Sequence, residues 1–304
     1  MLYPSRFSPS WSDAIAHHNK RIDTSPFAAV QALSQEDVVA VVDFVRTYNL
    51  VLSIKSTGHC YSGNCVQDDS FVLDLSKMNS IAMDPSGDSI TIGPGSNFDA
   101  LYSLVRSGEE RSSGAKILTP QLISITFAFS SQNSETGTQS VGGMCGTVGP
   151  VGFSLGGGHG PLIRSYGLGA DQILSVSMVL ANAEAVTVTE DSDFDLFWAL
   201  RGGAGGSFGV VTSITLKTYP APPQLTSYTC NYPLSVSEST AEGKATLASW
   251  WSDVMPNLSG AWHFFTIIAP LPIPMEVRRG EERNDELTRH AKRDIDVQSR
   301  YFRT

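Results

Sequence analysis

The sequence predicts an α+β protein in which a second domain follows a break near residue 222. Over residues 25–220, stretches with helical spacing alternate with short apolar runs that turn residues delimit. Pro220, Pro222 and Pro223 then end the last long alternating run, as is typical of a domain boundary. A chain of 304 residues can build such a core without disulfide support.

After an N-terminal segment of residues 1–24, the first expected helix begins at Ser34. Ser34 and Asp37 resemble a capping box, and valines then recur at helical spacing up to Asn49. These valines are Val38, Val41, Val42 and Val45. Short apolar runs predict the next strands at residues 50–54, 71–75, 81–83 and 89–92, and residues 97–106 predict a second helix.

The second half of the first domain predicts a hairpin, a helix and a long strand. The hairpin joins residues 173–180 to 185–188, and the long strand covers residues 210–219. A helix over residues 193–200 is expected to bury Phe194, Phe197 and Trp198. Beyond the prolines, we expect strands at residues 225–232 and 264–268 and a helix around Trp250 and Trp251.

Two segments do not fit this pattern. Residues 119–140 interrupt an otherwise continuous run from 116–118 to 141–143, which suggests a surface insertion or translated non-coding sequence. Residues 275–304 are about half charged, and this composition predicts a solvated or disordered tail.

Composition argues against several partners. The net charge of −9 and the pI near 5.1 disfavour nucleic acid and anionic membranes, and no apolar run approaches the roughly 20 residues of a membrane span. As written, the start of the chain up to Arg21 lacks the apolar core of a secretory leader. The four cysteines form no C-x-x-C pair; Cys60 and Cys65 could close a small loop in an oxidising compartment or remain two half-buried thiols.

Two glycine-rich loops are the most informative feature for function. They cover residues 55–63 and 142–149, and the second continues into the glycine run at 156–160. Each places one nucleophile, His59 or Cys145, among small neighbours. Since glycine allows sharp turns and close approach to a ligand, the pair predicts one large flat ligand held by main-chain N–H groups, and a flavin nucleotide is the obvious candidate.

Other kinds of site receive less support. The chain contains neither G-x-G-x-x-G nor G-x-x-x-x-G-K-S/T. Residues 152–156 match the G-x-S-x-G motif of serine hydrolases around Ser154, but glycines follow where a helix is required; His263 and His290 would be the downstream partners.

Three plainer interpretations of the loop residues also stay open. A metal site built from His59, Cys60, Cys65 and Cys145 lacks the usual ligand spacing. Taken alone, His59 could be a surface histidine bonded to a backbone carbonyl, and Cys145 an inert buried thiol.

Several motifs occur together in an order that resembles a known family. They are Gly58-His59-x-Tyr61-x-Gly63, Asp74-Leu75-Ser76, Met78-Asn79-Ser80-Ile81, Gly93-Pro94-Gly95, Gly143-x-Cys145-x-x-Val148-Gly149-x-x-Gly152, Gly156-Gly157-Gly158-His159-Gly160, Tyr166-Gly167-Leu168, Phe197-Trp198-Ala199-Leu200-Arg201-Gly202-Gly203 and Phe208-Gly209-Val210-Val211-Thr212. Over about residues 25–220 the chain resembles the vanillyl-alcohol-oxidase-type (PCMH-type) flavoproteins, in particular the berberine-bridge-enzyme-like and oligosaccharide oxidases. One departure is Thr57, which stands where the family usually has a glycine.

The resemblance implies a two-subdomain PCMH-type FAD-binding fold over residues 25–222, followed at 223–274 by the start of a substrate domain of β-sheet and helices. It implies FAD attached twice, through His59 to the 8-methyl carbon and through Cys145 to ring carbon 6. The further cofactor-binding positions it implies are Ser56, Thr57, Gly58, Cys60, Tyr61, Gly63, Gly146, Val148, Gly149, Gly152, Gly156, Gly157, Gly158, Gly160, Gly209 and Val210. No metal is implied.

The resemblance also implies a function. We expect an FAD-dependent oxidase that takes a hydride from an alcohol-type carbon, such as that of a sugar, and reduces O₂ to hydrogen peroxide. The family's catalytic base lies in a region with no counterpart in this sequence, so a truncated, non-catalytic flavin-binding product is the alternative. Family members are commonly exported, and one glycosylation sequon at Asn257 is compatible with export.

Overall fold

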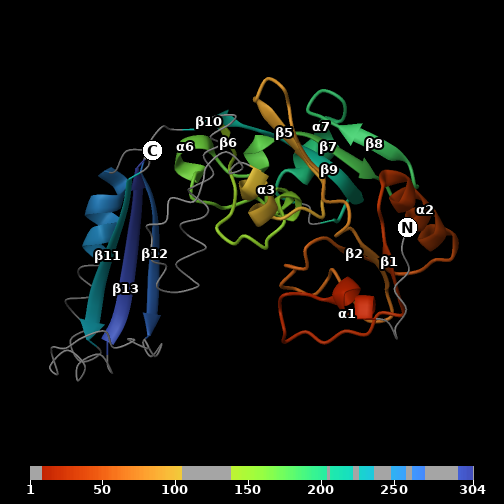
Figure 1. Cartoon of the computed structure of the whole chain (residues 1–304), viewed down its shortest axis with the longest axis horizontal. Coiled ribbons are helices and arrows are strands. Elements are labelled where there is room, and N and C mark those ends of the chain that lie inside the picture. The colour runs from red at the N-terminus through yellow and green to blue at the C-terminus, as the bar shows by residue number, and fades with distance from the viewer. Residues whose placement is uncertain are drawn as a thin grey trace. The chain divides into compact units, whose positions relative to one another are not determined.

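The computed structural model describes residues 9–104, 138–203, 206–221, 226–235, 248–257, 262–270 and 294–303 (Figure 1). The chain divides into two compact units, Met1–Ala221 and Pro222–Thr304. This division lies beside the proline-rich break. Helices and sheets are mixed in the first unit, in agreement with the predicted α+β class.

A small parallel sheet forms the first part of unit one. Its strands are β1 (Ala28–Gln31), β2 (Leu52–Lys55) and β3 (Phe71–Asp74), in the order β1-β3-β2. Because side chains alternate along a strand, Phe71 and Leu73 pack on one face with helix α2 (Gln35–Thr47), and Val72 packs on the other with Ala14 of α1 (Pro9–Ile15). The sheet is therefore covered on both faces.

Helix α2 begins where the capping box predicts. The Ser34 side chain accepts the Asp37 N–H at 3.4 Å, and the Asp37 carboxylate accepts the Leu33 N–H at 2.9 Å. Four buried valines, Val38, Val41, Val42 and Val45, form the inner face. The predicted cap and buried face are both confirmed.

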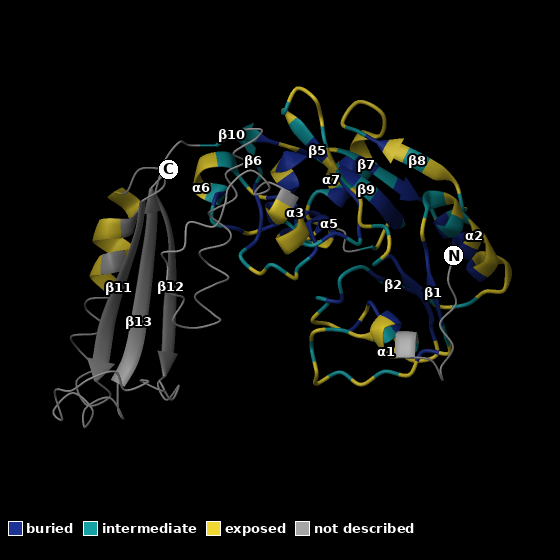
Figure 2. Cartoon of the chain, in the orientation of Figure 1, coloured by how far each residue is buried: buried dark blue, intermediate teal, exposed yellow. Residues whose placement is uncertain are grey.

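The second sheet has five antiparallel strands in the order β4-β5-β9-β7-β8. These strands are β4 (Ile81–Met83), β5 (Ser89–Ile92), β7 (Ile173–Val179), β8 (Ala185–Val188) and β9 (Val210–Lys217). Ile90, Val176, Met178 and Ile214 are buried along them, and Figure 2 shows the buried residues following the strands of this unit. Val179 and Val210 also join the apolar cluster of the first sheet, so strands β7 and β9 pack against that cluster.

Helix α7 (Phe194–Leu200) exists as expected, but its buried face differs from the prediction. Phe197 and Leu200 are buried, whereas Phe194 and Trp198 are 61% and 71% exposed. A two-turn helix presents only one stripe to the core, and here that stripe carries Phe197 and Leu200. Aromatic character alone therefore misassigned two of the three residues.

Short elements complete unit one. They are α3 (Phe98–Leu104), α5 (Pro150–Leu155), α6 (Ile163–Tyr166), a 3₁₀ turn η1 (Ala170–Gln172), β6 (Thr138–Gln139) and β10 (Tyr219–Pro220). The expected insertion at 119–140 lies outside the described residues up to 137. Its end does not behave as an insertion, because β6 pairs with β10 and Gln139 is buried.

The second unit contains one antiparallel sheet in the order β11-β13-β12. Its strands are β11 (Thr226–Ser235), β12 (Trp262–Pro270) and β13 (Asp294–Arg303), and a short helical stretch covers Trp250–Asn257. Strand β13 falls inside the charged segment that composition predicted as a solvated or disordered tail. Apolar Ile295 and Val297 alternate with polar residues there, a pattern typical of a strand.

Candidate functional site

The two glycine-rich loops meet at one hydroxyl group. His59 Nε2 lies 2.8 Å from Thr147 Oγ1, and Cys145 Sγ lies 3.5 Å from the same oxygen. Thr147 stands two residues after Cys145 and 88 residues after His59. The fold therefore brings the two predicted nucleophiles to a single small side chain.

Neither plain alternative for these residues describes the geometry. His59 is half-buried and its recorded partner is the Thr147 hydroxyl rather than a backbone carbonyl, while Cys145 is exposed rather than buried. Burial, together with the nearby His18, lowers the pKa of the His59 imidazole. At neutral pH His59 is therefore neutral, which is its nucleophilic form.

The first loop starts at the carboxyl end of the parallel sheet. The ends of the three strands, Gln31, Lys55 and Asp74, stand side by side. The Asp74 carboxylate accepts from Lys55 Nζ at 3.3 Å and from Gln31 Nε2 at 3.0 Å, and all three residues are buried. This network fixes the point at which the chain leaves β2, and the Ser56 hydroxyl then donates to the Pro94 carbonyl.

Helix α3 supports the second loop. The N–H groups of Phe98 and Asp99 donate to the carbonyls of Val148 and Gly146 at 3.0 and 2.8 Å, and Tyr102 Oη donates to the Gly143 carbonyl at 2.8 Å. A side chain at Gly146 would overlap the Asp99 carboxylate. Sequence reasoning predicted this helix but missed its role, because no motif distinguishes it.

Eight glycines of the site fall into two groups. At Gly58, Gly63, Gly146, Gly158, Gly160 and Gly209 an added Cβ would collide with other parts of the chain. At Gly152 and Gly157, by contrast, an added Cβ would have no neighbour within 4 Å. Gly152 is the glycine that the fold alone does not explain, since it lies inside helix α5, where alanine would make the helix more stable.

The remaining predicted positions are distributed around this region. Gly149 caps α5, and a Cβ added to it would lie 3.1 Å from the Thr57 side chain; Gly156 ends α5, and Tyr61 is 67% exposed. Cys60 Sγ lies 3.3 Å from Ser62 Oγ. Gly209 and Val210 lie at the start of β9 instead, where Val210 packs in the core beside Val179.

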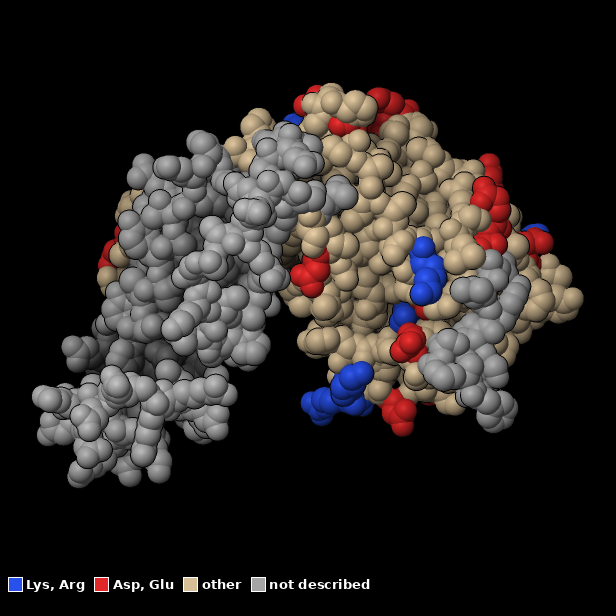
Figure 3. Space-filling model, in the orientation of Figure 1, with Lys and Arg blue, Asp and Glu red and all other residues tan. Residues whose placement is uncertain are grey.

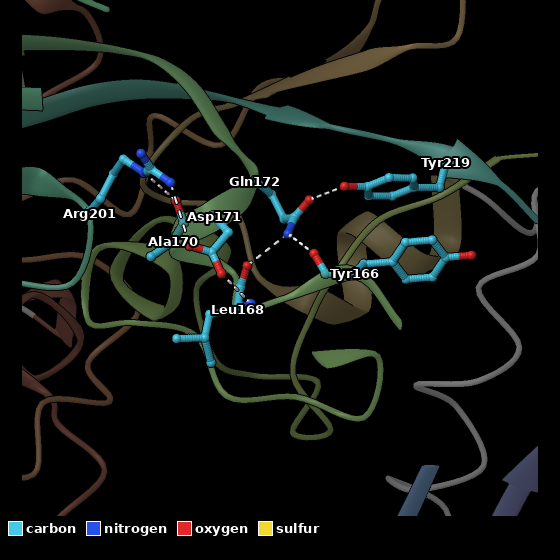
Figure 4. Close-up of polar contacts among 7 residues, drawn as sticks. All are labelled: Tyr166, Leu168, Ala170, Asp171, Gln172, Arg201 and Tyr219. Atoms are coloured by element: carbon cyan, nitrogen blue, oxygen red, sulfur yellow. Dashed lines mark hydrogen bonds and ion pairs between the residues drawn. The ribbon is translucent and has the colours of Figure 1, made fainter. Parts of the chain in front are cut away.

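The Gly157–Gly158 backbone rests on a turn that is held by Gln172, whose contacts with Tyr166, Leu168 and Tyr219 are drawn in Figure 4. Gly169 N–H and Ala170 N–H donate to the carbonyls of Gly158 and Gly157, both at 2.9 Å. Buried Gln172 accepts from Tyr219 Oη at 2.6 Å, and its amide donates to the carbonyls of Tyr166 and Leu168 at 2.7 and 2.9 Å.

Arg201 closes the other side of this turn. It donates to the Ala170 carbonyl at 3.1 Å and pairs with Asp171 at 3.5 Å (Figure 4). Gln172 belongs to none of the sequence motifs, and the Phe197–Gly203 motif that contains Arg201 does not indicate this role, because each residue acts through its tertiary position.

The hydrolase alternative does not fit the structure. Ser154 lies in the last turn of α5 rather than after a strand, and it is fully buried with an unpartnered Oγ. His263 is in β12 of the other unit, and His290 lies outside the described residues. A buried serine without a base cannot act as an exposed nucleophile.

The part of the chain that the structure describes contains no group of three or more His, Cys, Asp or Glu side chains able to hold a metal ion. No helix within the described ranges is both long and apolar enough to cross a membrane. On the face drawn in Figure 3, Lys and Arg side chains are few and scattered among Asp and Glu.

Comparison with known proteins gives this geometry a context. Residues 26–110 match the family model of an FAD binding domain. The xylooligosaccharide oxidase of Thermothelomyces thermophilus is 32% identical over 248 residues, which cover 81% of this chain and 44% of that protein. Berberine bridge enzyme-like 2 of Arabidopsis thaliana is 27% identical over 258 residues, covering 84% and 42%.

Solved structures show the same fold. The xylooligosaccharide oxidase from Myceliophthora thermophila C1, in complex with xylobiose, superposes with a TM-score of 0.73 at 26% identity and covers 98% of this chain and 53% of that one. For 6-hydroxy-D-nicotine oxidase from Arthrobacter nicotinovorans the TM-score is 0.74 at 24% identity, covering 99% and 55%. The chain thus spans about half the length of the relatives it matches, and the predicted PCMH-type resemblance is confirmed.

Proposed function

Because this chain belongs to the PCMH-type FAD-linked oxidoreductases, we propose that it holds FAD against its two glycine-rich loops through covalent bonds to His59 and Cys145. The observation that carries the proposal is the shared contact of His59 and Cys145 with the Thr147 hydroxyl. A flat ring laid on these loops would meet His59 at the methyl group on carbon 8 and Cys145 at carbon 6 of the same ring.

The residues present suit a flavin nucleotide. Imidazole and thiol are nucleophiles matched to the electrophilic carbons of an oxidised flavin, and small neighbours leave room for a ring. The open backbone at Gly152 and Gly157 would let a phosphate or ribose approach the main chain closely. The buried network at Lys55, Asp74 and Gln31 keeps the loop that carries His59 in a defined position.

His59 would bond through Nδ1, because Nε2 faces Thr147. Each new bond would replace one hydrogen of the protein group and one of the flavin carbon, which is a two-electron oxidation, and O₂ would be the oxidant that accepts the two hydrogens as hydrogen peroxide. The neutral imidazole favoured by the lowered pKa of His59 is the form this step requires.

The proposed reaction is oxidation of an alcohol-type carbon, most simply that of a carbohydrate. A bound flavin supplies hydride acceptance and transfer of electrons to O₂. The carbohydrate class is supported by the similarity to xylooligosaccharide oxidases in sequence and in structure. Peroxide release from added xylo-oligosaccharides would distinguish an oxidase from a non-catalytic flavin-binding protein.

Acid precipitation of the FAD-loaded protein tests the attachment. Flavin should pellet with the unmodified chain and with the single variants His59→Ala and Cys145→Ala, and should stay in the supernatant for the double variant. His159→Ala is the matched control, since it removes an exposed histidine from the neighbouring glycine run. Complete release of flavin by the unmodified chain would refute the covalent assignment.

Gly152 tests the open backbone separately. Replacing Gly152 with alanine should stabilise helix α5 by up to about 1 kcal/mol, because alanine is the better helix former, while lowering the retention of FAD. Gly160→Ala should instead destabilise the fold, since its Cβ would overlap the Gly142 carbonyl. Thermal unfolding and flavin absorbance measure the two effects independently, and equal FAD retention in Gly152→Ala would contradict a ligand at this face.

A further inference from the structure

The segment Ala16–Ile22 packs directly against the loop that carries His59. His18 N–H donates to the Gly58 carbonyl at 2.7 Å, and Asn19 Nδ2 donates to the Tyr61 carbonyl at 3.0 Å. The Ile22 side chain fills the space beside Gly63. This segment precedes residues 26–110, where the FAD binding domain is matched, so the match assigns it no role.

One side chain of this segment touches the predicted nucleophile itself. The His18 ring stacks on the His59 ring, with centroids 4.4 Å apart and planes 20° from parallel. Tyr61 lies beside His18 at 5.7 Å with a tilt of 53°. His17 anchors the segment from within, because its Nε2 bonds the Ile22 carbonyl at 2.8 Å.

We propose that His18 is a positioning residue for flavin attachment: its ring fixes the plane of the His59 imidazole, so that Nδ1 of His59 faces the flavin while Thr147 holds Nε2. This inference rests on the proposed covalent bond to His59. Two constraints are needed, because a hydrogen bond at one nitrogen still allows the ring to rotate about that contact. Stacking removes this freedom.

His18 also acts on His59 through charge. Among the described residues, the titratable groups linked to the His59 ring are His18, which stacks on it, Tyr61, which lies beside His18, and the Cys145 thiol, which shares the Thr147 hydroxyl. A protonated His18 opposes protonation of His59, which adds to the effect of burial on the pKa of His59. Phenylalanine at position 18 would keep the stacking and remove the charge, whereas alanine would remove both.

The experiment measures flavin attachment through His59 alone, because every protein tested also carries Cys145→Ala. Protein prepared without flavin is mixed with FAD, and conversion of flavin to the acid-precipitable form is followed in time. His18→Ala should slow attachment about ten- to hundredfold, as expected when a reacting group loses its orientation. His18→Phe should restore most of the rate at neutral pH, and the exposed neighbour Lys20→Ala should leave it unchanged.

A second readout does not depend on flavin. NMR titration of the flavin-free protein should show a higher pKa of His59 in both His18→Phe and His18→Ala, because each removes the neighbouring charge. Attachment in His18→Ala at the unmodified rate, or equal slowing in His18→Phe and His18→Ala, would overturn the positioning role. If the Cys145→Ala protein itself forms no acid-stable flavin, the proposed covalent bond to His59 is wrong. An unchanged pKa of His59 in both His18 variants would refute the contact between His18 and His59.

Discussion

Replacing Lys55 with methionine should destabilise the first unit by about 3–5 kcal/mol, which is the cost of leaving one partner of a buried ion pair without the other. The side chains of Lys55 and Asp74 are only 6% and 1% exposed. After the substitution, Asp74 would keep the N–H donors of Gln31 and Ser76 at 3.0 Å each but would face no cation. The lost charged hydrogen bond accounts for about 1.5–3 kcal/mol, and the uncompensated carboxylate accounts for the rest.

A double variant separates charge from packing. Asp74→Asn alone should cost a similar amount, because it leaves the Lys55 ammonium unpaired. Combining it with Lys55→Met should recover most of the loss, since an amide oxygen can still accept an N–H of Ser76 or Gln31 and brings no charge out of water.

Urea unfolding combined with hydrogen–deuterium exchange of peptides from β2 and β3 measures this part of the chain apart from the second unit. Amide exchange there should rise roughly 100- to 4,000-fold in Lys55→Met where exchange reports equilibrium opening. A loss below about 1 kcal/mol in both single variants, the range of exposed pairs, would show that the reasoning from burial is wrong.

Three further predictions concern single side chains. Phe197→Ala should cost about 3–5 kcal/mol in unfolding free energy, whereas Trp198→Gln on the same helix should change it by less than about 0.5 kcal/mol; equal losses would contradict the assigned face of α7. Burial raises the pKa of the Cys65 thiol to about 12, whereas hydrogen bonds outweigh burial at Cys60 and lower the pKa of its thiol. Iodoacetamide at about pH 8 should therefore modify Cys60 and spare Cys65, which peptide mass spectrometry would reveal. Ser154→Ala should leave stability unchanged or slightly raised in thermal unfolding, because it removes a buried hydroxyl that has no partner; a clear loss would indicate a partner for that oxygen.

Local features of the fold could be predicted because local chemistry determines them. The cap at Ser34, the valine face of α2 and the hairpin at 173–188 each follow from spacing within a few residues. The direction in which α7 faces could not be predicted in this way, because Phe194 and Phe197 are equally apolar and only tertiary packing selects one for the core.

For the candidate site, too, the local features could be predicted from the sequence and the tertiary contacts could not. Glycine clusters made the two loops visible in the sequence, and their nucleophiles suggested the chemistry. The meeting of His59 and Cys145 at Thr147 joins residues 88 positions apart, so no local pattern contains it. His18 was missed for a related reason: stacking depends on where a ring lies in space, and a pair of histidines in an irregular segment carries no motif.

The two groups of glycines bear on how related sequences are compared. At Gly158 and Gly160 the protein's own backbone already forbids a side chain, so a descendant that had lost its cofactor would still be held to glycine there by folding alone. Retention at these positions therefore reports on the fold and not on the ligand. At Gly152, packing would accept alanine and helix propensity would favour it, so only an external group can explain selection against the substitution. Drift away from glycine at this one position would be an early sign, readable from sequence, that a lineage no longer keeps FAD.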